Sequence, residues 1–226
     1  MIKQATIKNS FLVEGKGLHT GKGSKLIFYP APVNTGIVFV KEDVEIPALY
    51  NFVCDTNRRV ILENKGKKIS TVEHLLSALY SLGISNLYIH VIGEEIPILD
   101  GSAQEWIKLF MDSGINLQDA IREEFALKNP LFVKEKRRVL FLFPSERFEV
   151  LGVISFPNSY VKWQRYFLKG LEEYYTEIAP ARTFGFHYEV EELIKRGLIG
   201  GADLNNALLI GEDGYINEAR FSDEPV

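Results

Sequence analysis

The chain has 226 residues, of which 46% are hydrophobic and 25% are charged, a composition typical of a soluble globular protein with one large or two small domains. Its formal net charge of −4 gives no general attraction to nucleic acid or anionic membranes, so bound phosphate would need a local site. The single cysteine, Cys54, excludes an intramolecular disulfide, and no apolar run reaches the roughly 18 residues of a membrane-spanning helix.

In chain order, the first part of the sequence predicts three strands, over residues 6–13, 25–29 and 36–40. A loop over residues 14–23 joins the first two strands, and its glycines allow positive φ angles. This arrangement indicates a hairpin with a glycine-rich connection.

Two helices are predicted in the same part of the chain. The first spans residues 69–82, because its apolar side chains recur at helical spacing. These apolar positions are Val72, Leu75, Leu76, Leu79 and Leu82. The second helix spans residues 103–112, where Ser102 and Glu105 have the spacing of a capping box. An alternating strand over 86–92 separates the two helices.

From about residue 125 a second series of strands and helices is expected. The strands are predicted over 131–133, 139–143, 148–156 and 160–168, the helices over 171–178 and 187–196, and a turn and strand over 199–201 and 206–210. Strands followed by helices, occurring twice, predict an α+β fold of two similar domains, residues 1–124 and 125–226. The charged stretch over 119–124 is the expected linker.

Glu73 and His74 form the most informative pair of neighbours in the sequence. A carboxylate and an imidazole at the start of a helix can supply a general base and a metal ligand for a zinc-activated water. The alternative is structural, because Ser70 and Glu73 also have the spacing of a capping box. The spacing by itself favours the cap, whereas His74, which lies off the apolar stripe, shifts the balance toward a cleft.

Three other segments have both a functional and a structural interpretation. His19 lies in a glycine-flanked loop, which forms either one edge of a cleft or an exposed hairpin. Asp100 and Ser102 are typical of a turn and helix cap, with a serine nucleophile at Ser102 as a weaker alternative. Thr183 is either a hydrogen-bond donor to an oxyanion or part of a structured turn, and the residues alone favour the turn.

Taken together, these segments resemble the family of UDP-3-O-acyl-N-acetylglucosamine deacetylases, the zinc amidases of lipid A biosynthesis. The motifs occur in the family's order and cover essentially the whole chain. They are Gly15–Gly21, Pro30–Ile37, Ser70–Leu75, Glu95–Ser102 and Ala181–Phe186. The resemblance implies two α+β domains, each a sheet with packed helices, with the helices sandwiched between the sheets and the zinc site between the domains. It also implies a cytoplasmic monomer that acts on a small molecule, without nucleic acid.

The resemblance assigns roles to individual residues. His74 corresponds to a zinc ligand, and Glu73 to the general base that takes a proton from zinc-bound water. Thr183 corresponds to the residue that stabilises the tetrahedral oxyanion, and Phe184 to one that contacts the substrate near the reacting centre. His19 is expected near the metal, as a site for a second, inhibitory zinc ion.

The family's second domain carries an insert, expected here near residues 186–213, that forms an apolar passage for the acyl chain of the substrate. The candidates for its lining are Ile194, Leu198, Ile199, Leu204 and Leu208. The alternative for these side chains is ordinary packing in a small βαβ unit. Cys54 is expected near the insert of the first domain, with no role assigned.

The sequence also departs from the family's pattern. A helix beginning His-Lys-x-x-Asp, which supplies the other two zinc ligands, is expected beyond Val226, as is a later histidine. With one of three ligands, the 226-residue chain alone is expected to bind zinc weakly, and its second domain is expected to be incomplete. We interpret the chain as a truncated deacetylase. The alternative is a non-catalytic module that binds the sugar nucleotide or acyl group without a complete zinc site.

Overall fold

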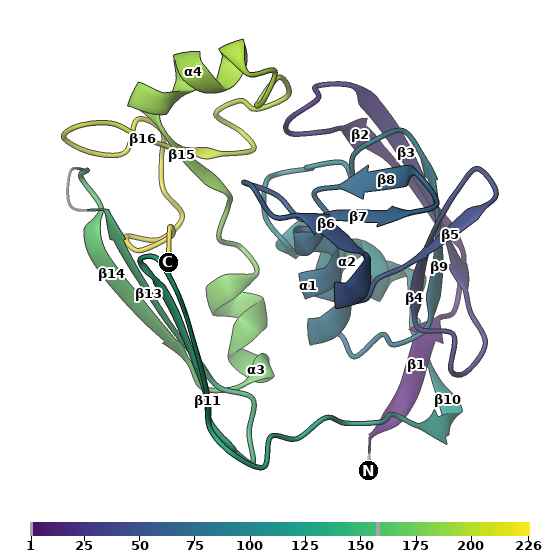
Figure 1. Ribbon diagram of the computed structural model, residues 1–226. Coiled ribbons are helices and arrows are strands. Elements are labelled where there is room, and N and C mark those ends of the chain that lie inside the picture. Colours follow the sequence, from purple (N-terminus) through teal and green to yellow (C-terminus); the bar gives the residue numbers. More distant parts are fainter. Residues whose placement is uncertain (1, 157–158) are drawn as a thin grey trace.

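The computed structural model describes residues 2–156 and 159–226, and its fold is α+β, as predicted (Figure 1). Figure 1 shows a first lobe that ends with strand β10 (Ile115–Ile121) and a second lobe that begins with strand β11 (Leu131–Glu135). Residues 122–130 connect the lobes. The predicted linker over 119–124 therefore begins too early, because residues 119–121 are still paired within a sheet. The division into domains 1–124 and 125–226 stays a prediction.

A five-stranded sheet in the order β2-β3-β9-β4-β5 forms the base of the first lobe. The strands are β2 (Phe11–Lys16), β3 (Gly23–Pro30), β4 (Ile37–Lys41), β5 (Val44–Pro47) and β9 (Leu87–Ile92). Side chains alternate between the two faces of a strand, and Leu26 and Phe28 of β3 accordingly share the buried face. Their register partners in β9, Val91 and Ile89, are buried too.

Helices α1 (Glu73–Ser81) and α2 (Gln104–Ser113) pack against this buried face (Figure 1). The ring of Phe110 meets that of Phe28 edge to face, with the centroids 5.2 Å apart, and Trp106 lies on the same ring at 6.1 Å. Aromatic contacts of this geometry contribute about 0.5–1.5 kcal/mol beyond the burial itself. This packing fixes the position of α1 on the sheet, and with it the position of Glu73, the first residue of the helix.

The prediction of one strand over 6–13 is wrong. Strand β1 (Lys3–Ile7) leaves the main sheet and pairs with β10 in a separate two-stranded sheet. The chain is interrupted after β1 because the backbone N–H of Lys8 donates to the carbonyl of Gly114 at 2.8 Å, just beyond α2. A partner far along the chain therefore decides where the strand ends.

The predicted helix over 69–82 begins at Glu73 instead, because Ile69 and Ser70 end strand β8 (Lys67–Ser70). Thr71 then has a φ of +61°, which is incompatible with a right-handed helix. Strand β8 belongs to a three-stranded sheet with β6 (Val53–Asp55) and β7 (Ile61–Asn64), which the sequence analysis missed together with β5 and the short 3₁₀ turn at Tyr50–Phe52.

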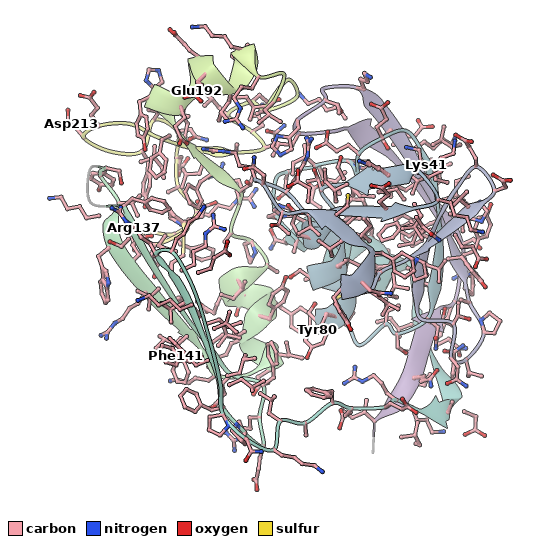
Figure 2. The ribbon with its side chains drawn as sticks, viewed as in Figure 1. Lys41, Tyr80, Arg137, Phe141, Glu192 and Asp213 are labelled. Atoms are coloured by element: carbon pink, nitrogen blue, oxygen red, sulfur yellow. The ribbon has the colours of Figure 1, made fainter. Side chains whose placement is uncertain are left out.

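Two antiparallel hairpins open the second lobe, and all four of their strands were predicted. They are β11 with β12 (Arg138–Leu142), and β13 (Val150–Phe156) with β14 (Lys162–Leu168). Every residue of β11 and β12 is exposed, and Phe141, 59% exposed, projects from this hairpin (Figure 2).

The rest of the second lobe is helical turns followed by a small βαβ unit. Helix α3 (Leu171–Glu173) continues into one π-helical turn over Tyr174–Ile178. Strand β15 (Phe184–Phe186) leads through a 3₁₀ turn (His187–Glu189) and helix α4 (Val190–Lys195) to strand β16 (Leu208–Ile210), which pairs with β15 in parallel. No helix within the described ranges is both long and apolar enough to cross a membrane.

Helices α1, α2 and α3 lie between the five-stranded sheet and the β13–β14 hairpin (Figure 1). Contacts between the lobes hold them there: the hydroxyl of Tyr175 donates to the carbonyl of Ser81 at 2.6 Å, and the N–H of Ala103 donates to the carbonyl of Ala179 at 3.0 Å. Tyr80, at the end of α1, packs on the ring of Phe148 (Figure 2), with centroids 5.4 Å apart. These contacts bring residues 181–186 beside the start of α2.

Candidate functional site

The loop that carries His19 is held by hydrogen bonds within the loop and from the second lobe. Its own turn is closed by a hydrogen bond from Gly21 N–H to the Gly17 carbonyl at 3.1 Å. From the second lobe, Gly200 N–H donates to the His19 carbonyl at 2.9 Å, and Gly201 N–H donates to the Leu18 carbonyl at 3.0 Å. His19 is only 4% exposed, so the interpretation of this segment as an exposed hairpin is wrong.

The ring of His19 is buried without hydrogen bonds. Neither Nδ1 nor Nε2 forms a hydrogen bond of normal geometry with a described residue, although the Arg58 backbone lies close enough to act on the ring, and such an arrangement is rare for buried polar atoms. Burial lowers the pKa of His19 below its ordinary value; the Arg59 guanidinium acts in the same direction, and the Glu95 carboxylate opposes both. The imidazole is therefore neutral at neutral pH, with a free nitrogen lone pair.

Glu73 is the first residue of α1, but it does not form the predicted capping box. The hydroxyl of Ser70 donates to the Glu94 carbonyl at 3.2 Å instead of closing the helix. Oε2 of Glu73 accepts from the backbone N–H of Val60 at 3.0 Å, which fixes the carboxylate across the loop that follows β6. The prediction that Glu73 forms a capping box with Ser70 is therefore wrong, because its carboxylate accepts from the Val60 amide instead.

His74 is half-buried beside Glu73. Burial lowers the pKa of His74 below its ordinary value, against the opposing charges of Glu73 and Asp100. The neutral imidazole is the form that binds metal ions. The Glu73 carboxylate also acts to raise the pKa of His19, so its charge affects both histidines.

Asp100 and Ser102 form a turn rather than a catalytic pair. The Ser102 hydroxyl donates to the Asp100 carboxylate at 2.9 Å and accepts from Gln104 N–H at 3.2 Å. The predicted capping box of Ser102 and Glu105 is therefore wrong, because α2 is capped at Ala103 without a side-chain hydrogen bond. Ser102 is fully buried and has no histidine partner among the described residues, which argues against a serine nucleophile. Asp100 is instead paired with Arg220 at 2.9 Å.

Thr183 is fixed by its backbone on both sides. Its N–H donates to the Gly101 carbonyl at 2.8 Å, and its own carbonyl accepts from Leu208 N–H at 2.9 Å. Phe184 follows as the first residue of β15. The structure therefore places Thr183 and Phe184 at the edge of the Asp100–Ser102 turn.

An apolar cavity of about 310 Å³ runs from His19 and Thr183 into the βαβ unit of the second lobe. Its lining includes three of the five candidates from the sequence, Ile199, Leu204 and Leu208, together with Phe184. Ile194 and Leu198 do not line it. The helical period explains the difference for Ile194, because α4 turns Leu193 inward and leaves the next residue, Ile194, 59% exposed.

The sequence analysis gave no role to four charged residues near the site, Arg58, Glu95, Arg220 and Glu224. Arg58, which lines the cavity, forms a two-point ion pair with Glu189 at 2.9 and 3.2 Å and so links the lobes. Glu224 pairs with Arg182, and Arg220 with Asp100. Glu95, the fourth, lies in a motif quoted from the sequence, and its signal there was a carboxylate directly before an apolar run.

Glu95 stays ionised inside the protein. Burial works to raise the pKa of Glu95, but hydrogen bonds from Thr20, Thr71 and His19 outweigh it and leave the pKa below its ordinary value. Cys54, by contrast, is exposed in β6, and the structure gives it no part in the site.

The described residues do not complete a metal site on their own. No group of three His, Cys, Asp or Glu side chains within 2–156 and 159–226 is arranged to hold a metal ion. His74 and His19 are the neutral nitrogen donors of the region. A metal bound here would need further ligands in addition to these.

Comparison with known sequences places the chain in a family. The sequence model of the family described as LpxC, UDP-3-O-acyl N-acetylglycosamine deacetylase, matches residues 4–226. The chain is 41% identical to the UDP-3-O-acyl-N-acetylglucosamine deacetylase of Aquifex aeolicus over 99% of its own length and 78% of the relative's. It is 38% identical to that of Syntrophotalea carbinolica over 100% of its own length and 75% of the relative's. The bifunctional enzyme LpxC/FabZ of Bacteroides thetaiotaomicron is 38% identical over 94% of this chain and 47% of that protein.

Proposed function

Because this chain belongs to the family of UDP-3-O-acyl-N-acetylglucosamine deacetylases, we propose that it hydrolyses the N-acetyl amide of UDP-3-O-acyl-N-acetylglucosamine to the free amine and acetate, in lipid A biosynthesis. The observation that best supports the proposal is the continuity of a polar site with an apolar cavity. His19 and Thr183 line the same cavity as Ile199, Leu204 and Leu208. A substrate that carries both an amide and an acyl chain matches such a site.

Zinc is the proposed cofactor, with His74 as one of its ligands. A bound zinc ion supplies Lewis-acid chemistry and lowers the pKa of a coordinated water to about 7. The donor set on this chain fits in part: His74 is neutral, as a ligand must be, but the described residues supply no group of three ligands. A zinc ion bound here would need ligands in addition to His74, and we propose that His19 provides a second, weaker place for zinc.

Glu73 is the proposed general base. One of its oxygens, Oε2, is held by the Val60 N–H, which orients the carboxylate without neutralising it. The other oxygen is left to take a proton from the attacking water. A positioned base of this kind contributes about 10²–10⁴-fold to the rate.

Thr183 is the proposed donor to the oxyanion of the tetrahedral intermediate. Hydrogen bonds to Gly101 and Leu208 fix its backbone before substrate binds. Such preorganisation is what makes a donor effective, since no rearrangement is needed as charge develops. Phe184, the next residue, is proposed to contact the substrate near the reacting carbon.

The apolar cavity is the proposed site of the acyl chain. Its lining carries few polar groups, and Leu208 at its wall is fully buried. Burial of each methylene of the chain contributes about 0.8 kcal/mol to binding. Ile194 and Leu198 take no part in this proposal.

Acetate release by the protein tests the proposal. We expect turnover of UDP-3-O-acyl-N-acetylglucosamine that is lost on chelation and restored by zinc. Zinc-loaded protein that does not release acetate would contradict the assignment. The alternative, a module that only binds the sugar nucleotide or the acyl chain, predicts ligand affinity with a zinc content near zero. We further propose a cytoplasmic monomer, which light scattering after size exclusion and cell fractionation would test.

A further inference from the structure

Glu95 is a buried carboxylate to which the proposed reaction gives no role. It is 1% exposed, and no described Lys, Arg or His forms an ion pair with it. Oε1 accepts from His19 N–H at 3.0 Å and from the Thr71 hydroxyl at 2.7 Å. Oε2 accepts from both the N–H and the hydroxyl of Thr20 at 2.8 Å. A buried charge without a counterion is costly even when it is hydrogen-bonded, so what these bonds hold in place is informative.

The first segment that Glu95 holds is the loop carrying His19. The backbone amides of two successive residues, His19 and Thr20, both point at the carboxylate. The loop is shaped around it, because a Cβ on Gly17 would lie 2.6 Å from the Glu95 carboxyl carbon, which real Cβ atoms do not approach. Only glycine at position 17 allows the carboxylate to reach the loop.

The second segment that Glu95 holds is the turn that leads into α1. Thr71 has a φ of +61°, a conformation that costs a β-branched residue on the order of 1–3 kcal/mol. Its hydroxyl bond to Glu95 and its N–H bond to the Val60 carbonyl, at 2.9 Å, hold it there. Val60 in turn donates its own N–H to Glu73. Hydrogen bonds therefore link Glu95 to Thr71, Thr71 to Val60, and Val60 to the Glu73 carboxylate.

We infer that Glu95 is a positioning residue for the deacetylation, because a single buried carboxylate sets the places of Glu73–His74 and of His19 together. This inference rests on the proposed function. Glu95 is hydrogen-bonded to Thr71 and to the His19 loop, and it acts on the reaction through these two segments. Since a displacement of about 1 Å at a catalytic group can cost on the order of 100-fold in rate, loosening this link should be visible in turnover.

The test replaces Glu95 by Gln in the zinc-loaded protein. Gln keeps the shape of the side chain but turns an NH₂ group toward donors that need an acceptor. We expect kcat to fall about 10- to 100-fold, with KM changed by less than about threefold. Glu94→Gln is the matched control and should retain wild-type kcat, because the side chain of Glu94 is exposed and its one ion pair among the described residues is with Lys22, at 3.1 Å. An inactive wild-type protein contradicts the proposed function, whereas full activity in Glu95→Gln contradicts this inference alone.

A double-mutant cycle separates positioning from general support of the fold. If Glu95 acts through Glu73, then Glu95→Gln should cost little additional kcat in a Glu73→Gln background, since the base is already lost. An equal loss in both backgrounds would contradict the inferred coupling of Glu95 to Glu73.

A second pair of variants tests the same link if Glu95→Gln does not fold. Thr71→Val removes the hydroxyl that reaches Glu95 and keeps the side-chain shape, whereas Thr71→Ser keeps the hydroxyl. We expect the kcat of Thr71→Val to fall at least about tenfold below that of Thr71→Ser. Equal kcat values for the two variants would also overturn the inference.

Discussion

The guanidinium of Arg182 and the carboxylate of Glu224 meet at 2.8 Å in the interior of the second lobe. Glu224 also accepts from the backbone amides of Arg182 and Arg220, at 2.9 and 2.7 Å. Arg182 directly precedes Thr183, and Arg220 pairs with Asp100. This buried network therefore connects the residues near Val226 to both sides of the proposed oxyanion site.

Glu224→Gln is expected to destabilise the protein by about 3–5 kcal/mol at pH 7, because it leaves the Arg182 charge buried and unpaired. Urea denaturation measures the change. Glu94→Gln, which removes a surface ion pair with Lys22, serves as control and should cost less than about 1 kcal/mol. Comparable losses in the two variants would contradict the special role of the buried pair.

The Glu224 contribution should also depend on pH. Burial opposes ionisation, but the hydrogen bonds from Arg182 and Arg220 hold the pKa of Glu224 below its ordinary value of 4.5. Since the folded pKa is the lower one, the stabilisation is fully present above pH 4.5 and is lost as the pH falls through the folded pKa. The difference in unfolding free energy between wild type and Glu224→Gln should therefore shrink below pH 4.5.

Glu73→Gln is expected to lower kcat by about 10²–10⁴-fold without loss of zinc, because it removes the proposed base and no metal ligand. Gln is preferable to Ala, since its carbonyl oxygen can still accept from Val60 N–H. Acetate release and metal analysis on the same preparation make the measurement. Glu105→Gln, at the start of α2, should leave both unchanged. Turnover near the wild-type level in Glu73→Gln would exclude Glu73 as the base.

Gly101→Ala should cost more stability than Gly36→Ala, although both glycines have positive φ, +86° and +77°. At Gly36 nothing lies near an added Cβ, so the cost is that of the backbone conformation, about 1–2 kcal/mol. At Gly101 the Cβ would lie 2.6 Å from the carbonyl carbon of Asn206, and overpacking should add about 1–3 kcal/mol. Thermal unfolding compares the two variants. Because the Gly101 carbonyl holds Thr183, only Gly101→Ala should also lower kcat.

Ala207→Phe is expected to raise KM for the acylated substrate by about 10–200-fold. This is the range over which an apolar pocket discriminates ligands that differ by one methylene group. Ala207 lines the cavity, and a phenyl ring there would occupy space meant for the acyl chain. The same substitution at the exposed Ile194, outside the lining, is the control and should leave KM unchanged. Steady-state kinetics with substrates of different acyl length would show whether the effect grows with chain length, as the proposal requires.

Local signals in the sequence accounted for most elements. Strand β9, helix α2 and the strands of both hairpins in the second lobe lie where local patterns predicted them. Periodicity works for β9 and α2 because each has one face against the core, whereas every residue of β11 and β12 is exposed and their apolar, β-branched and aromatic composition predicted them as strands. The errors occur where a distant partner decides the outcome: β1 leaves the main sheet for β10, and β8 extends to Ser70 because it pairs with β7.

The candidate site divides in the same way. The sequence offered Glu73, His74, His19 and Thr183 as candidates, because polar side chains in ordered motifs are visible without a fold. The sequence did not show that Glu73 is held by Val60, that the His19 loop is closed by Gly200 and Gly201, or that Glu95 supports both segments. Each of these is a hydrogen bond between residues brought together only by tertiary structure.

By itself, then, the sequence determined the α+β class, the family resemblance and the candidates for the site, because these depend on residue type and local spacing. Only the tertiary structure decided that Glu73 is no helix cap, that Ser102 is buried, and that Ile199, Leu204 and Leu208 form one wall while Ile194 faces solvent. The physical reason is that burial and hydrogen-bond partners are properties of the whole packed chain. A buried carboxylate such as Glu95 is stable only after distant segments have closed around it.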